Sequence, residues 1–199
     1  PEGSPIEPAR AADLWRLNEA LLKGRSLQKL LLSDGGATPS MDLYDVTWYD
    51  LDLALSPLTH VLSGVVTIRA TVTGDLLRSL DLHLVDNLAV ASVTLGAAPL
   101  AFTHQLGLIT VTLPRDYLLG EDFELAITYS GDPAGASFGW GNVNGQDLVW
   151  TLSEPYGARE WWPCKDLNAD KADGADIQIT VPSNLIVASN DNLVSQQNV

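Results

Sequence analysis

A repeat of two residues in the hydrophobic pattern runs through most of the chain after Leu43, and it restricts the fold more than any other feature. Across residues 61–73 the even positions are mainly apolar and the odd positions are mainly polar. Successive side chains of a β-strand point to opposite faces, so this pattern predicts a strand with one buried and one solvated face. The residues predicted to face inward are Leu62, Val66, Ile68, Ala70 and Val72.

Three further segments alternate in the same way, at residues 80–84, 108–113 and 123–129. Strands with one solvated face are mostly antiparallel. Turn residues separate these segments, so the pattern favours an all-β antiparallel sandwich or barrel over alternating β and α units. The residues predicted to face inward are Leu80, Leu82, Leu84, Ile109, Val111, Leu113, Phe123, Leu125, Ile127 and Tyr129.

Other segments after Leu43 carry weaker signals. Residues 42–55 change parity partway along, which predicts a β-bulge or a crossing between sheets. The Gly/Asn-rich residues 135–146 are predicted to form a loop. Later strands are predicted at residues 147–152, 176–181 and 185–188.

The first part of the chain has a different pattern. Residues 8–23 place Leu14, Leu17 and Leu21 on one stripe, with Pro8 near the first turn, which predicts an amphipathic helix. A second short helical turn is predicted within residues 26–32, and turn residues at 33–40 indicate a linker. We therefore expect an N-terminal helical segment and linker at residues 1–40 and a β domain at residues 41–199.

Charge and hydropathy exclude some classes of partner. The chain has 199 residues, enough for one sizeable domain, with 11 Lys and Arg against 25 Asp and Glu and a formal net charge of −14. Such acidity argues against a nucleic-acid partner. No apolar run reaches the roughly 18 residues of a membrane span, so none is expected. The acidity and the β-rich pattern favour a periplasmic or secreted location.

Common catalytic motifs are absent from the sequence, including HExxH, CxxC, GxSxG and a phosphate-binding glycine loop. The histidines His60, His83 and His104 lie far apart and do not have zinc-ligand spacing. His83 falls on the polar parity of its strand and is predicted to be a surface imidazole. Residues 166–176 have the D-x-N-x-D spacing of a calcium loop, but Lys171 replaces the required glycine and no Glu follows, so calcium is not expected.

The stretch EPYGAREWWPCKD, residues 154–166, contains the only cysteine and two adjacent tryptophans. Cys164 would be a nucleophile only with a base beside it, and Lys165 could lower its pKa; without a nearby histidine, a buried structural thiol is favoured. In an extended segment Trp161 and Trp162 would face opposite sides. Either one packs inward and the other outward against a neighbouring domain, or the turn at Pro163 buries both.

The run from Leu148 to Asn190 resembles the N-terminal domain of the M1 zinc aminopeptidases, the aminopeptidase N and leukotriene A4 hydrolase group. The earlier runs YDLDLAL, LSGVVTIRATVTG and LDLHLVDNLAV are similar to the first strands of that family, so the likeness covers residues 43–199. One departure follows Asp166, where the family often has Glu-Pro and this chain has Leu167-Asn168. The residues that carry the likeness are Glu154, Arg159, Trp162, Pro163, Cys164, Asp166, Lys171 and residues 179–182.

The resemblance implies an all-β, saddle-like antiparallel sandwich that packs against a thermolysin-like catalytic domain. In the family that catalytic domain holds zinc through HExxH and a later Glu, and it removes N-terminal residues from peptides. This chain contains no HExxH. The resemblance therefore implies a fragment that is inactive alone and holds no cofactor, whose partners are its own catalytic domain and the N-terminus of a peptide substrate.

The resemblance also assigns a role to Glu154, ten positions before Cys164. The matching family residue grips the free α-ammonium of the substrate. A carboxylate fixed there discriminates an ammonium from an internal amide, which is what an aminopeptidase requires. The other reading of Glu154 is a strand-end residue in a surface turn. Arg159, Asp166 and Lys171 are interpreted as scaffold charges, and Trp162, Pro163 and Cys164 as the packed turn beside them.

Two further interpretations remain open on the sequence. The chain could be a stand-alone β-sandwich module for adhesion or carbohydrate binding, with Trp140, Trp150, Trp161 and Trp162 as stacking platforms. It could also belong to a non-peptidase protein that uses this domain for assembly. A stand-alone adhesion or carbohydrate-binding module does not require the set Glu154, Arg159, Cys164 and Asp166, and its tryptophans are not spaced on a single strand face.

Overall fold

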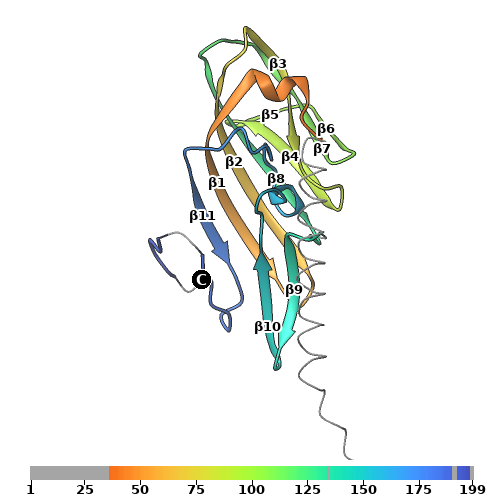
Figure 1. Cartoon of the computed structure of the whole chain (residues 1–199), viewed down its shortest axis with the longest axis vertical. Coiled ribbons are helices and arrows are strands. Elements are labelled where there is room, and N and C mark those ends of the chain that lie inside the picture. Colours follow the sequence, from red (N-terminus) through yellow and green to blue (C-terminus); the bar gives the residue numbers. More distant parts are fainter. Residues whose placement is uncertain (1–35, 134, 190–191, 198–199) are drawn as a thin grey trace, which may run out of the picture. The chain divides into compact units, whose positions relative to one another are not determined.

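The computed structural model describes residues 36–133, 135–189 and 192–197 (Figure 1). The helix predicted at residues 8–23, the turn predicted within 26–32 and the first residues of the predicted linker lie outside these ranges. A 3-10 helix, η1 (Pro39–Leu43), begins in the last two residues of that predicted linker and continues into the β domain, where Met41 is buried.

Eleven strands and two 3-10 helices make up the described part, and nearly all strand pairs are antiparallel, as the alternation predicts. The strands form a six-stranded sheet in the order β11-β1-β2-β8-β4-β5, a three-stranded sheet in the order β3-β7-β6, and a two-stranded hairpin of β9 and β10. The one parallel pair between the described strands joins β1 to β11. The elements are η1, β1 (Tyr44–Ser56), β2 (Val61–Val72), β3 (Leu76–His83), β4 (Leu88–Leu95), β5 (Ala98–Pro99), β6 (Phe102–Gln105), β7 (Leu108–Leu118), β8 (Asp122–Gly131), β9 (Phe138–Val143), β10 (Gln146–Thr151), η2 (Ala158–Glu160) and β11 (Gly174–Thr180).

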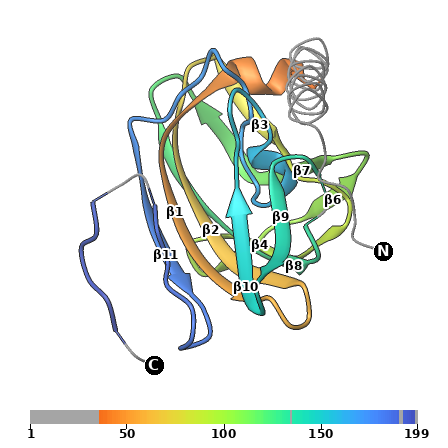
Figure 2. The ribbon, with the colours of Figure 1, turned by 60° about the horizontal axis from the view of Figure 1, so that its bottom comes forward.

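One hydrophobic core lies between the six-stranded and three-stranded sheets (Figure 2). All residues predicted to face inward from β2, β3, β7 and β8 are buried, together with Leu84 just after β3. Burial of a large apolar side chain contributes about 1.5–3 kcal/mol, so these alternating positions fix the register of each strand. The mostly-β sandwich predicted from the sequence is therefore confirmed.

The parity change in β1 is a β-bulge. The register of β1 against β2 shifts between Val46 and Trp48. Tyr44 and Val46 are buried before the shift and Tyr49 is buried after it, while Trp48 is only half-buried. The extra residue lets β1 keep its apolar side chains on the core face along its whole length.

Three local predictions are wrong. Residues 135–146 are not one loop: after bends at 135–137 they form β9, the turn into β10 and the first residue of β10, with Asn144 and Gly145 at φ 53° and 84°. An Asn-Gly pair suits the left-handed backbone of a tight hairpin turn, so this signal was present in the sequence. Residues 185–188 form no strand in the described structure, where Ile186 is almost fully exposed and lacks a partner strand.

The third error concerns His83, which is buried rather than on the surface. The alternation places it correctly on the face of β3 away from the central core. A segment eighty residues later covers that face, and His83 pairs with Cys164 in an isolated antiparallel bridge. Hydrophobic alternation reports the faces of one strand and carries no information about a distant covering segment.

Candidate functional site

The candidate site is the connection between β10 and β11, residues 152–173, and its shape is set by one carboxylate. Asp166 Oδ2 accepts hydrogen bonds from the Gly157 backbone N–H at 3.1 Å and from Arg159 Nε at 2.7 Å. Arg159 Nη2 also donates to the Asp166 carbonyl at 3.0 Å. The side chains of Arg159 and Asp166 are 23% and 7% exposed, so little water competes for these bonds.

Three further hydrogen bonds fasten this connection to the sandwich. The backbone groups of His83 and Cys164 exchange hydrogen bonds of 2.7 and 3.1 Å. The Asp166 N–H donates to His83 Nδ1 at 3.2 Å, which requires that Nδ1 carry no proton. His83 is therefore a structural residue that orients the turn containing Asp166.

Lys165 is buried in the same region and supports the loop from the other side. Its Nζ donates to the Tyr44 carbonyl at 2.6 Å, forms an ion pair with Asp170 and lies 4.6 Å from the centre of the Tyr44 ring. Its backbone N–H donates to Tyr49 Oη at 3.0 Å. Lys171, which the sequence suggested as a scaffold charge, is exposed.

The turn of η2 resolves the question of the adjacent tryptophans. Both Trp161 and Trp162 donate backbone N–H groups to the Ala158 carbonyl, at 3.1 and 3.0 Å. This turn brings both indoles partly into the core, with their ring centres 6.0 Å apart. Trp162 also packs edge-on against Tyr49 at 4.7 Å. Pro163 after them is buried.

Cys164 is a structural thiol. Its side chain is 2% exposed. Burial raises the pKa of the thiol well above its ordinary value, and the nearby Asp166 carboxylate raises it further against the opposing effect of Arg159. The thiolate needed for nucleophilic chemistry is therefore disfavoured, and the thiol is buried, as the sequence predicts.

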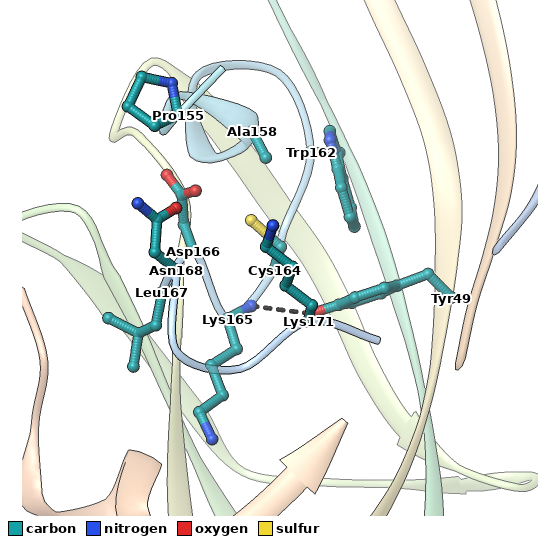
Figure 3. Close-up of a pocket in the computed structure, with 10 residues that line it drawn as sticks. All are labelled: Tyr49, Pro155, Ala158, Trp162, Cys164, Lys165, Asp166, Leu167, Asn168 and Lys171. Carbon is teal, nitrogen blue, oxygen red and sulfur yellow. Dashed lines mark hydrogen bonds between the residues drawn. The ribbon is translucent and has the colours of Figure 1, made fainter. Parts of the chain in front are cut away.

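Glu154 occupies a different environment at the start of the connection. Its side chain is exposed and makes no hydrogen bond or ion pair with the residues that the structure describes. The next residue, Pro155, follows a cis peptide bond and lines a pocket of about 170 Å³ (Figure 3). The Glu154 carboxylate therefore lies near the start of the connection, and the hydrogen bonds of Asp166 fix the later part.

Apolar and polar groups both line the pocket in Figure 3, and its lining residues are Tyr49, Pro155, Ala158, Trp162, Cys164, Lys165, Asp166, Leu167, Asn168 and Lys171. The Trp162 Nε1–H is buried and has no acceptor among the described residues. No three His, Cys, Asp or Glu side chains in the described ranges gather closely enough to hold a metal ion.

The family described as the peptidase M1 N-terminal domain matches residues 46–199. This chain belongs to that family. Among solved structures, a mutant M1 zinc metallopeptidase from Deinococcus radiodurans bound to a Tyr-Ser-Ala substrate is 29% identical, with a TM-score of 0.67. The match covers 78% of this chain and 37% of that chain, so this M1 N-terminal domain spans little more than a third of that relative.

More distant structures share the fold of this M1 N-terminal domain. Native leukotriene A4 hydrolase from Saccharomyces cerevisiae is 23% identical, with a TM-score of 0.57, over 71% of this chain and 24% of that chain. No curated protein matches this chain. Within the described residues, no helix is long and apolar enough to cross a membrane.

Sequence reasoning missed two residues that hold this M1 N-terminal domain together at the site, His83 and Lys165. Neither has a local signal: His83 sits at a polar position of an alternating strand, and Lys165 is a charged residue beside another charge. Their burial comes from contacts more than eighty residues away in sequence. The ion pair of Arg159 and Asp166 joins two residues that the family likeness singled out.

Proposed function

We propose that this chain is the N-terminal, substrate-anchoring and scaffolding domain of a zinc-dependent aminopeptidase, which removes N-terminal residues from peptides. The zinc would be held by a catalytic domain elsewhere in the parent enzyme. The family match over residues 46–199 carries this proposal. The described residues of the chain do not form a metal site, so we propose that the chain alone is inactive.

Glu154 is the residue that we propose binds the substrate. An exposed carboxylate with no partner in the described structure is free to accept hydrogen bonds from an α-ammonium. The connection after it is fixed by the buried Asp166, which limits the entropy lost when a substrate binds. An internal peptide amide has no positive charge, so the same carboxylate would favour N-terminal residues.

The proposal is tested by Glu154→Ala in the parent enzyme, assayed on an aminoacyl-p-nitroanilide. Loss of a charged hydrogen bond costs about 1.5–3 kcal/mol, so kcat/KM is expected to fall roughly tenfold to a hundredfold, mainly through a higher KM. Glu124→Ala is the matched control, because Glu124 is an exposed carboxylate on β8 that pairs with Arg69. An unchanged kcat/KM for Glu154→Ala would contradict the anchor assignment.

The stand-alone binding module fits the arrangement of the tryptophans less well. Trp161 and Trp162 pack against the core. Trp140 stacks on His60 at 5.3 Å and donates to Asp132, while Trp150 lies on the opposite face of the hairpin. The four indoles therefore do not form one exposed platform for a sugar.

A further inference from the structure

His83 is a buried histidine whose ring accepts a hydrogen bond from the candidate site. The residue is 1% exposed, and its Nδ1 atom accepts the Asp166 backbone N–H at 3.2 Å. A neutral imidazole has one ring nitrogen with a proton and one without, so this bond selects the neutral tautomer that carries its proton on Nε2. Imidazoles generally titrate between pH 5 and 8, so a proton can remove this acceptor under conditions in which proteins work.

Asp166 transmits the constraint to the residues that follow Glu154. Its backbone N–H is held by His83, and its side-chain Oδ2 accepts the Gly157 N–H at 3.1 Å. Figure 3 shows the Asp166 carboxylate directed toward the turn of η2. A glycine can adopt many backbone conformations, so this bond selects one of them, three residues after Glu154. The path of the chain next to Glu154 therefore depends on where Asp166 is held.

Protonation of His83 would remove the first bond of this series. Nδ1 and the Asp166 nitrogen would then both carry hydrogen, and two donors would face each other across the 3.2 Å contact. A buried donor left without an acceptor costs more than an ordinary hydrogen bond contributes. The bond is therefore present while the imidazole is neutral, and it is lost as the pH falls through the range in which His83 takes up a proton.

Other charged and titratable groups lie around His83. The carboxylate of Asp81, two residues earlier on β3, attracts a positive charge on the ring, which opposes the cost of charging a buried group. Among side chains, histidine is the type that ordinarily titrates between pH 7.5 and 5, so His104 is the main competitor. The groups are Asp81 on β3, His104 on β6, Tyr44 and Tyr49 on β1, and Arg159, Cys164, Lys165, Asp166 and Asp170 in the connection.

We infer that His83 is a positioning residue for Glu154, and that its protonation loosens the β10–β11 connection and weakens binding of the substrate N-terminus at acid pH. This inference rests on the proposed function of Glu154. Among the described residues Glu154 has no side-chain partner, so the backbone around it sets its position. A displacement of about 1 Å can cost on the order of a hundredfold in rate, so a small movement of this backbone is enough.

NMR spectroscopy of the 199-residue chain tests the hydrogen bond itself. At pH 7.5 the His83 ring is expected to be the tautomer protonated on Nε2. As the pH is lowered to 5, the amide signals of Asp166 and Gly157 are expected to shift with the same midpoint as the ring. In His83→Asn the side-chain oxygen can replace Nδ1 as the acceptor and does not titrate, so these shifts should disappear. The other tautomer, or amide signals that do not follow the ring, would overturn the inference.

Kinetics of the parent enzyme test the effect on binding, with an aminoacyl-p-nitroanilide as the substrate. Between pH 7.5 and 5, KM is expected to rise at least about threefold more in the wild type than in His83→Asn, while kcat changes alike in both. Titration of the substrate amine and of Glu154 affects both proteins equally and cancels in this comparison. Equal rises in KM would overturn the inference.

Two more variants separate the acceptor from the charge and from the neighbouring histidine. His83→Leu has no acceptor, so its KM at pH 7.5 should already be at least about threefold above wild type, whereas His83→Asn should have a KM close to wild type. His104→Asn is the control, because His104 Nε2 bonds the Leu84 carbonyl at 3.0 Å and not a group of the connection. This control should keep the pH dependence of KM, and its loss there would overturn the inference.

Failure of this inference and failure of the proposed function give different results. An unchanged kcat/KM for Glu154→Ala together with coupled NMR shifts would reject only the anchor. The expected loss for Glu154→Ala together with equal pH dependence in the wild type and His83→Asn would reject only the role of His83. If His83→Asn does not fold, the wild-type NMR titration and His104→Asn decide the question.

Discussion

At the scale of single residues, Asp81 links three elements through one carboxylate. Its side-chain oxygens accept hydrogen bonds from Thr38 Oγ1 at 2.7 Å, Ser40 Oγ at 2.9 Å and Thr110 Oγ1 at 2.5 Å. Burial alone would raise the pKa of Asp81, but the hydroxyl donors outweigh it and hold the pKa below the ordinary 3.8. The carboxylate therefore fastens the start of the domain to β3 and β7.

This lowered pKa predicts a pH-dependent contribution to stability. The unfolded chain binds the proton more readily, so the contribution of Asp81 is full above pH 3.8 and is lost as the pH falls through the lower folded-state pKa. Asp81→Asn is expected to lower the free energy of unfolding by about 1–2 kcal/mol at pH 7. The difference from wild type should shrink below pH 3.8 in urea unfolding of the 199-residue chain.

Asp75→Asn serves as the control for this experiment, since Asp75 is exposed in the turn before β3. It is expected to change the free energy of unfolding by less than about 0.5 kcal/mol. A difference between Asp81→Asn and wild type that stays constant from pH 7 to pH 3 would contradict the role assigned to the hydroxyl donors.

Residues of the core could be predicted from the sequence, whereas the polar residues around the site could not. The strand pattern alone predicts the burial of Leu62, Val66 and Ile68, because all three lie on the core-facing side of β2. His83 and Lys165 are buried by hydrogen bonds to distant residues, and those partners have no trace in the local pattern. Arg159 and Asp166 were predicted as scaffold charges from the family likeness, because periodicity carries no information about them.

At the scale of elements, the connection between β10 and β11 depends on the pair of Arg159 and Asp166. Arg159→Met removes the guanidinium and leaves the buried Asp166 carboxylate with fewer donors. We expect a loss of about 2–4 kcal/mol in the free energy of unfolding, measured by urea denaturation of the 199-residue chain.

Arg78→Met is the matched control for that substitution. Arg78 forms an ion pair of 2.8 Å with Asp116, but the two side chains are 70% and 45% exposed. Such pairs contribute at most about 1 kcal/mol, so the control should lose much less stability. Equal losses in the two variants would show that the Arg159 pair does not fix the connection.

The strands themselves were predictable where alternation was strong and not where glycine interrupts it. β2, β7 and β8 follow from apolar residues at every second position. β9 was missed because its glycines at 139 and 141 remove half of the pattern, although one of them gives the Trp150 indole a surface to lie on. Residues 185–188 have strand-forming side chains but no neighbouring strand in the described structure, so propensity alone was misleading.

At the scale of the whole molecule, we propose a division of function in which this chain binds the substrate N-terminus and the catalytic domain of the parent enzyme carries out the zinc chemistry. The 199-residue chain is expected to hydrolyse aminoacyl-p-nitroanilides negligibly, while the parent hydrolyses them and loses this activity when a chelator removes its metal. Added Zn²⁺ should restore the parent. The Tm of the 199-residue chain should not change with the chelator, and hydrolysis by the chain alone would contradict the division.

The pairing of β1 with β11 joins the beginning of the domain to its end. Trp48 pairs with Gly174, and the bond between Trp48 Nε1 and Asp176 spans 128 residues. A ribosome adds roughly 5–20 residues per second, so during synthesis one edge of β1 stays unpaired for on the order of 6–25 seconds before β11 has been made. Throughout that interval β1 has an unpaired edge, which makes the newly made chain most open to wrong strand pairing before residue 180 has emerged.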